Sequence, residues 1–137
     1  MNVTQGTKLT KDDKSLFQGK NFAFIATLMK DGSPQITPTW VDVDGDLILI
    51  NTAEGRVKEK NVKRDKRVAV SIVDSANPYN MVTVRGKVVE QVTNGADAHI
   101  DKLAKKYLGM DKYPYRTPTE KRVILKIHAD KVFHMAP

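Results

Sequence analysis

The chain of 137 residues contains no cysteine, which excludes disulfide bonds and thiolate metal sites. It has no apolar run near the ~18–20 residues that would span a bilayer. The segment from Met1 to Thr7 lacks the charged and apolar regions of a secretory signal. We therefore expect a cytoplasmic protein with no membrane partner.

Motifs for several kinds of chemistry are also missing. There is no Walker loop, no Gly-x-Gly-x-x-Gly and no Gly-x-Ser-x-Gly elbow. The three histidines, His99, His128 and His134, do not stand at metal-ligand spacing, so we expect structural or surface histidines and no metal. No catalytic side chain can be named. If the protein is an enzyme, a bound cofactor supplies its chemistry.

The composition, with 40% hydrophobic and 28% charged residues, fits one globular domain over residues 1–137. Lys and Arg number 23 against 16 Asp and Glu, a net charge of +7 that favours an anionic partner. Seven of the cations and three of the acids fall between Glu54 and Arg67. Such runs are most often solvated helix faces. Only nine aromatic residues are present, several inside apolar runs, so we do not expect a nucleic-acid partner.

Local patterns predict six strands and three helices. The hydroxyl of Thr10, followed by the acids Asp12 and Asp13, predicts a helix with Thr10 as its N-cap. Asp31-Gly32 predicts a hairpin turn. Pro34 and Pro38 predict an edge, a bulge or a place where the neighbour is not a strand, and Gly86 predicts a bulge or bend. The predicted strands are 22–29, 33–43, 47–50, 68–73, 81–92 and 122–133. The second predicted helix covers 56–64. The third is amphipathic, with Asn94 as its N-cap and Gly109 at its end. The interval from Asn51 to Gly55 is expected to break a strand. Short strands with Asp-Gly turns favour a mainly β, α+β fold with a closing antiparallel sheet.

The most informative stretch runs from Asn51 to Asn61. Cations in the first turn of a helix oppose the helix dipole, so Arg56 and Lys58 are unfavourable there unless an anion lies between them and the backbone N–H groups. Both reach one anion only if Arg56 lies at or before the helix start, which Gly55 allows. Asn61, one turn beyond Lys58, can add a hydrogen bond. The pattern predicts a phosphate site.

Three ordered motifs resemble a known family. They are Phe24-Ile-Ala-Thr-Leu with Asp31-Gly-Ser-Pro-Gln-Ile-Thr-Pro-Thr-Trp-Val, then Asn51-Thr with Gly55-Arg-Val-Lys-Glu-Lys-Asn, then Asp65-Lys-Arg-Val-Ala-Val-Ser-Ile. Together they are similar to the pyridoxamine 5′-phosphate oxidase-like superfamily, and more narrowly to its branch of F420-dependent oxidoreductases. The likeness covers about half of the chain.

The resemblance implies a split β-barrel homodimer with two cofactor sites at the subunit interface. It assigns the grip on the cofactor phosphate to Arg56 and Lys58, helped by Asn61. Further cofactor-binding residues that it implies are Asn51 and Thr52 at the ribityl chain or ring, Thr37 and Pro38 beside the ring, and Tyr79 and Met81 from across the dimer. Tyr79, Met81 and Trp40 are equally compatible with ordinary packing.

We therefore predict an oxidoreductase that transfers a hydride between coenzyme F420 and an unidentified small organic substrate. The glutamate tail of F420 would explain the additional cations Lys60, Lys63 and Arg64. FMN is the alternative cofactor, in a pyridoxamine phosphate oxidase-related flavin reductase or oxidase, and a non-catalytic cofactor carrier is a second alternative. The chain ends in Phe133-His-Met-Ala-Pro137 without the arginine motif by which pyridoxamine phosphate oxidases hold their substrate, so that activity is not expected.

Overall fold

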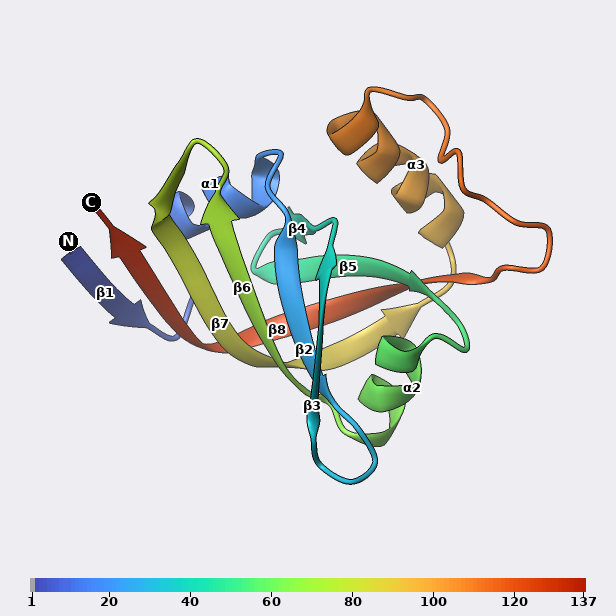
Figure 1. The fold of residues 1–137 in the computed structure, drawn as a ribbon, viewed down its shortest axis with the longest axis horizontal. Coiled ribbons are helices and arrows are strands. Elements are labelled where there is room, and N and C mark those ends of the chain that lie inside the picture. The colour runs from blue at the N-terminus through green and yellow to red at the C-terminus, as the bar shows by residue number, and fades with distance from the viewer. Residues whose placement is uncertain (1) are drawn as a thin grey trace.

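A computed structural model describes residues 2–137 of the chain and forms one antiparallel sheet with three helices (Figure 1). The strands are β1 (Asn2–Gly6), β2 (Ala23–Leu28), β3 (Pro34–Thr39), β4 (Asp42–Asp44), β5 (Leu47–Ala53), β6 (Arg67–Asp74), β7 (Asn77–Val92) and β8 (Arg122–Ala136). The helices are α1 (Lys11–Gln18), α2 (Val57–Arg64) and α3 (Ala96–Leu108). The strand order is β3-β2-β6-β7-β8-β5-β4, and β1 pairs with β8.

The long strands β7 and β8 form the spine of the sheet. Along one side β8 pairs with β7; along the other its first half pairs with β5 and its second half with β1. Register shifts beside Gly86 and after Val88 bend β7. A Cβ atom at position 86 would overlap the carbonyl oxygen of His128, so the bend requires glycine there. The predicted bulge at Gly86 is confirmed.

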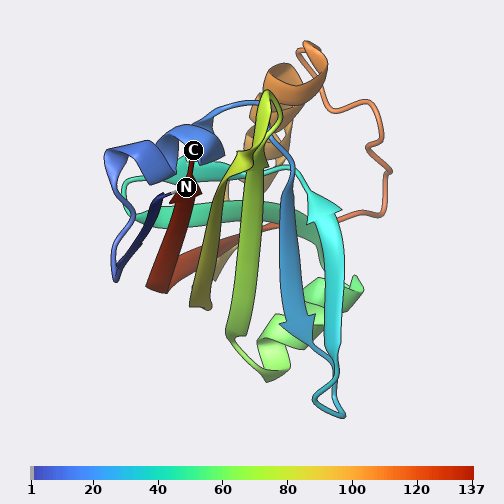
Figure 2. The same ribbon diagram turned by 60° about the vertical axis from the view of Figure 1, so that its left-hand side comes forward.

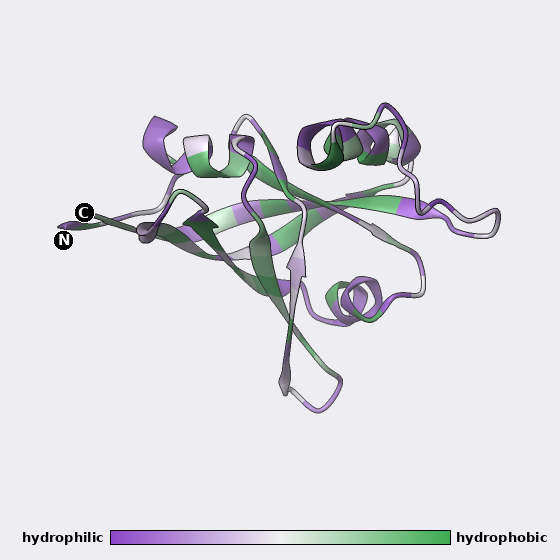
Figure 3. Cartoon of the chain, turned by 45° about the horizontal axis from the view of Figure 1, so that its top comes forward, coloured by the Kyte–Doolittle hydropathy of each residue, from purple (hydrophilic) through white to green (hydrophobic). Residues whose placement is uncertain are grey.

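The core lies on the concave face of the sheet, where alternate residues of β2, β6 and β7 meet α1. Leu16 and Phe17 of α1 are buried against this face. The helix begins as predicted, because Thr10 accepts a hydrogen bond from the Asp13 amide and Asp13 accepts one from the Thr10 amide. Hydrophobic residues run along the strands, whereas the helices carry both hydrophobic and hydrophilic residues (Figure 3).

Strand β5 is buried on both faces. Ile48 and Ile50 belong to the main core, whereas Leu49 packs with Ala96 of α3 on the other face. The turned view separates α3 and α2, which lie at opposite ends of the strands (Figure 2). This arrangement leaves the end of β5 between two helices, where the candidate site is found.

The outer face of β2, β3, β6 and β7 has no helix over it and is largely apolar. The strand register aligns Pro38, Phe24, Ser71 and Thr83 in one row across the four strands. A second row contains Ile36, Ala26 and Ala69, and ends on β7 at the exposed Arg85. Phe24 is 42% exposed and Ile36 is 63% exposed. We name this surface, Phe24, Ala26, Ile36, Ala69 and Ser71, the outer sheet face.

Several local predictions are confirmed. Residues Asp31 and Gly32 form the β2–β3 turn, with Gly32 at φ +85°, and β3, with both prolines, lies at the sheet edge. The antiparallel sheet is also confirmed.

Other predictions are wrong. The structure has eight strands rather than six, and the strand pairings of residues 2–137 do not close the sheet. The predicted strand 33–43 is divided into β3 and β4. Asn51 to Ala53 continue β5 because they pair with β8, and α3 begins after Gly95, not Asn94. Gly95 is in the left-handed region at φ 80°, which favours glycine over asparagine.

Candidate cofactor site

A cavity of about 240 Å³ lies among the ends of β3 and β5, the start of α2 and the segment that joins α3 to β8. It combines positively charged, hydroxyl, amide and aromatic side chains. The lining residues are Phe22, Pro38, Thr39, Trp40, Asn51, Thr52, Arg56, Lys58, Ile100, Tyr113, Tyr115 and Arg122.

Three cations meet in this cavity. Arg56 is the N-cap residue of α2 and makes no capping hydrogen bond, and Lys58 lies in the first turn. Lys58 is half-buried, and burial, followed by the charges of Arg56 and Arg122, lowers its pKa. Lys58 itself has no ion-pair partner within residues 2–137; the ion pairs of Arg56 and Arg122 are with Glu120. An anion in the cavity would stabilise the charged form of Lys58.

One acid, Glu120, stands beside two of these cations. It forms an ion pair with the buried guanidinium of Arg122 and lies 3.9 Å from Arg56. Three cations against one acid leave the cavity positively charged. Such a surplus of charge is unfavourable in the absence of a ligand and favours an anionic one.

The cavity also holds an unpaired buried hydroxyl. Thr52 is 1% exposed, and its Oγ1 atom has no hydrogen-bond partner among residues 2–137. Buried polar atoms are nearly always hydrogen-bonded. The first backbone N–H groups of α2 have no acceptor within the helix either. A phosphate group carries enough acceptor oxygens for the hydroxyl, the N–H groups and the two cations of α2.

Aromatic rings form another wall of the cavity. Trp40 stacks on Tyr107, with ring centroids 5.3 Å apart and an interplanar angle of 4°. Tyr113 meets Trp40 edge to face at 5.9 Å, and Tyr115 meets Tyr113 at 5.7 Å. The guanidinium of Arg122 lies 5.2 Å from the Tyr113 ring. A planar ring system fits beside such a wall.

Helix α3 fixes this wall. The Tyr107 hydroxyl donates to the carbonyl of Asn21 at 2.6 Å and accepts from the amide of Val41 at 3.1 Å. Asp101 accepts hydrogen bonds from the amide of Tyr113, at 2.8 Å, and from Arg116, at 2.6 Å. The Tyr113 amide, more than Arg116, lowers the pKa of Asp101. The carboxylate therefore anchors the segment that brings Tyr113 to the cavity.

Five of the nine residues predicted to bind a cofactor line this cavity. They are Pro38, Asn51, Thr52, Arg56 and Lys58. Thr37 does not line it; it pairs with Ile25, which is in the core. The condition that Arg56 lies at or before the helix start is met, because Arg56 is the N-cap residue of α2.

Asn61 lies away from the cavity and is buried. Its amide donates to Thr27 Oγ1 at 3.0 Å and to Met29 Sδ at 3.3 Å, and its oxygen accepts from Arg64. These contacts bind α2 to β2. The structure therefore gives Asn61 partners within the protein and does not place it beside Arg56 and Lys58.

Tyr79 and Met81 lie at the start of β7 and do not line the cavity either. Tyr79 is 63% exposed. Within one chain they have no part in the site, which is consistent with a contribution from a second copy.

Several residues of the cavity carry no local signal in the sequence. Arg122 is brought there by the pairing of β8 with β5, opposite Ala53. Tyr113 and Tyr115 were visible only as part of a loop rich in Tyr and Pro. The three histidines behave as expected: His99 and His134 are hydrogen-bonded, and His128 is exposed.

A larger cavity, of about 460 Å³, lies across β2, β6 and β7 and borders the outer sheet face. Its lining is largely apolar, with Arg67, Arg85 and Asp130 as its charged members. It lacks the converging cations of the first cavity. Among residues 2–137, no three His, Asp or Glu side chains gather as metal ligands would. None of the helices described is long and apolar enough to cross a membrane.

Comparison with known proteins gives the class of this fold and site. A family model described as pyridoxamine 5′-phosphate oxidase matches residues 9–136. The chain belongs to this family.

Solved structures with the same fold include an F420 reductase, with 30% identity over 87% of this chain and 94% of that one and a TM-score of 0.76. Another is a possible pyridoxamine 5′-phosphate oxidase of Lactobacillus delbrueckii, 22% identical over 96% and 98% of the two chains, with a TM-score of 0.66. HupZ of Group A Streptococcus is also 22% identical, over 91% and 92%, with a TM-score of 0.67. The last two likenesses concern the fold alone.

Proposed function

We propose that this protein is an oxidoreductase that binds coenzyme F420 in the cavity beside α2. The observation that carries the proposal is the meeting of Arg56, Lys58 and the unpaired Thr52 hydroxyl at one end of a cavity with an aromatic wall. A phosphate and a planar ring, joined in one molecule, match these two parts.

The residues present fit such a cofactor. Arg56 and Lys58 would hold the phosphate together with the N–H groups at the start of α2. The Thr52 hydroxyl would donate to the phosphate, and Asn51 would face the chain between phosphate and ring. Trp40 and Tyr113 would orient the ring and exclude water from one side of it. When bound, the deazaflavin supplies hydride transfer, which needs no acid or base from the protein.

F420 is favoured over FMN for two reasons. The solved structure at 30% identity is an F420 reductase, and the exposed face of α2 carries further cations for a polyglutamate tail. Lys60 is exposed and has no ion pair within residues 2–137, whereas Lys63 pairs with Glu59 at 3.0 Å and Arg64 donates to the carbonyl of Leu28. Lys60 is therefore the tail contact that needs no rearrangement. FMN, which requires only the phosphate grip, is the second candidate.

The site is proposed to be completed by a second copy of the chain. The outer sheet face is apolar, exposed and without a covering helix. Monomeric proteins rarely leave a contiguous apolar surface of this kind uncovered. A two-fold dimer through this face would bury Phe24 and Ile36 and bring a partner's strands toward the cavity. Tyr79 and Met81 would then contribute to the cofactor site from across the interface.

The test of the function combines binding with turnover. The purified protein is titrated with F420 and with FMN, and the complex with the reduced cofactor is then mixed with small organic hydride acceptors. The oxidoreductase is supported if the protein binds F420 and if an acceptor oxidises the reduced cofactor faster with the protein present than without it. Binding without acceleration by any acceptor identifies a cofactor carrier, and binding of FMN alone identifies a flavin protein.

A further inference from the structure

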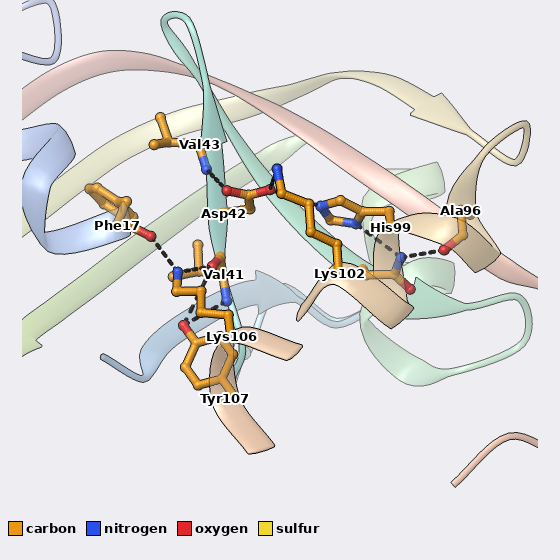
Figure 4. A network of polar contacts seen from close by, with 10 residues as sticks. Phe17, Val41, Asp42, Val43, Ala96, His99, Lys102, Lys106 and Tyr107 are labelled. Atoms are coloured by element: carbon orange, nitrogen blue, oxygen red, sulfur yellow. Dashed lines mark hydrogen bonds and ion pairs between the residues drawn. The ribbon is translucent and has the colours of Figure 1, made fainter. Parts of the chain in front are cut away.

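We propose that His99 is a positioning residue for the cofactor cavity: its ring fixes the orientation of the Asn51 amide and, through that amide, of Arg122. The inference rests on the proposed function, because Asn51 and Arg122 line the cavity that would hold the cofactor. His99 itself does not line the cavity. It is a residue of helix α3, and its ring extends toward Asp42 of strand β4 (Figure 4).

The orientation of the Asn51 side chain follows from two neighbours with fixed roles. The Nε atom of Arg122 is only a donor, and it lies 2.9 Å from the Asn51 oxygen. The carbonyl oxygen of Ala96 is only an acceptor, and it lies 2.9 Å from the Asn51 nitrogen. The amide therefore points its oxygen toward Arg122 and its nitrogen toward α3.

This orientation determines the tautomer of His99. The Asn51 nitrogen also lies 3.1 Å from Nδ1 of His99. Because that nitrogen donates, Nδ1 must accept, and the ring proton is on Nε2. Nε2 lies 3.3 Å from a carboxylate oxygen of Asp42, which accepts this proton. Asp42, His99, Asn51 and Arg122 thus form one chain of hydrogen bonds with a single direction.

Asp42 keeps its charge in this network. Burial alone would raise its pKa, but hydrogen bonds from His99, the Val43 amide and Lys102 outweigh burial and hold the pKa well below its ordinary value. The charged groups around the His99 ring are Asp42 on β4, Lys102 on α3 and, beyond Asn51, Arg122 on β8. Asp42 therefore remains an acceptor for Nε2–H throughout the neutral range.

A second proton on His99 is incompatible with this arrangement. Protonated Nδ1 would become a donor facing the donor nitrogen of Asn51. Rotation of the amide would offer its oxygen to His99 but would turn its nitrogen against Nε of Arg122. The Asn51 oxygen cannot serve both neighbours, so a charged His99 costs Arg122 its hydrogen bond to the Asn51 side chain and leaves it held mainly from one side, by the ion pair with Glu120. Cofactor affinity is expected to fall as His99 becomes protonated.

The first test does not require a cofactor. Long-range ¹H–¹⁵N spectra of the histidine rings, with His99 assigned by its absence from a His99→Asn variant, report the tautomer directly. The expected result at pH 8 is a His99 ring with its proton on Nε2. An Nδ1–H tautomer, or a mixture of the two, would overturn the inference.

The second test measures F420 affinity for matched variants. His99→Leu removes the acceptor for Asn51, and the dissociation constant should rise about tenfold, the equivalent of one buried hydrogen bond. His99→Asn offers an amide oxygen close to the place of Nδ1 and should restore affinity to within about threefold of the parent. Equal affinity in the Leu variant and the parent, or equal loss in both variants, would contradict a positioning role.

The pH profile distinguishes positioning from packing. Affinity of the parent should decrease with falling pH around the midpoint at which the His99 ring titrates in the spectra. The His99→Asn variant should show no step there, and it controls for titration of the ligand. The same step in both proteins would overturn the inference. If the parent does not bind F420 or FMN at all, the proposed function fails, and the spectra alone decide the tautomer.

Discussion

Nε of Arg122 donates a 2.9 Å hydrogen bond to Oδ1 of Asn51. The bond crosses from β8 to β5 and joins two residues that are 71 positions apart in the chain. Arg122 is 5% exposed, and its other main partner is Glu120. The positive wall of the cavity therefore depends on a buried ion pair and on an amide held from the opposite side.

The Arg122–Glu120 pair should be important for folding as well as for binding. Arg122→Leu leaves a buried carboxylate without its main partner, and we expect the free energy of unfolding to fall by about 3 kcal/mol. Urea denaturation measures this change. The double variant with Glu120→Leu should recover at least half of the loss, because no unpaired charge remains. A double variant as unstable as the single one would show that packing, not charge, is responsible.

Stability should depend on pH through Lys106 and Tyr107. Burial lowers the pKa of Lys106 to about 8, so its contribution is lost as pH falls through 8 and grows as pH rises toward its unfolded value, near 10.4. Burial raises the pKa of Tyr107 to about 12, so its contribution is present below pH ~10 and lost as pH rises toward 12. Stability should increase from pH 8 to 10 and then decrease.

Thermal unfolding over this range provides the check, with Lys106→Met as the control. This variant lacks the titrating amine that donates to the carbonyls of Phe17 and Val41. It should be less stable overall, and the rise between pH 8 and 10 should be absent. A rise of equal size in the variant would assign it to other groups.

Salt should weaken F420 binding more steeply than FMN binding, because only F420 has a glutamate tail, which on the proposed function would lie over exposed cations. Lys60→Glu should flatten the salt slope for F420 and leave that for FMN almost unchanged. Titrations at several salt concentrations measure both slopes. Equal slopes, or tighter binding of FMN at every concentration, would favour an FMN protein whose basic helix is only a solvated face.

The outer sheet face should form a two-fold interface that buries on the order of 2,000 Å². Ala26→Glu places a charge on this face between Ile36 and Ala69, and sedimentation should show a monomer in place of a dimer. Val89→Glu, at an apolar residue that is 48% exposed elsewhere on β7, should leave the dimer intact. A parent protein that is monomeric at micromolar concentration and still binds cofactor would contradict the interface.

The parts of the fold that could be predicted depend on neighbours in sequence. The Thr10 cap, the Asp31-Gly32 turn and the adjoining cations Arg56 and Lys58 are all specified within a few residues. Strand β1 was missed because all of its residues are exposed and carry no apolar alternation. It exists because β8 extends far enough to pair with it.

Half of the cavity depends on contacts that no local pattern reveals. Arg122 and His99 reach Asn51 from 71 and 48 positions away. Asn61 illustrates the reverse error: its spacing from Lys58 suggested a shared ligand, but Thr27 takes its amide. The spacing of residues along a helix shows which face of the helix each one occupies. Which partner that face contacts depends here on the packing of α2 against β2.

The most direct test of the account is the F420 dissociation constant of Arg56→Ala and Lys58→Ala, compared with the parent and with Lys87→Ala, an exposed lysine on β7. Each cavity variant should lose about 1.5–3 kcal/mol of binding free energy, the range for a hydrogen bond to a charged group, while its unfolding curve stays close to that of the parent. Lys87→Ala should bind as the parent does. Unchanged affinity for F420 and FMN in both cavity variants would place the cofactor elsewhere and contradict the account.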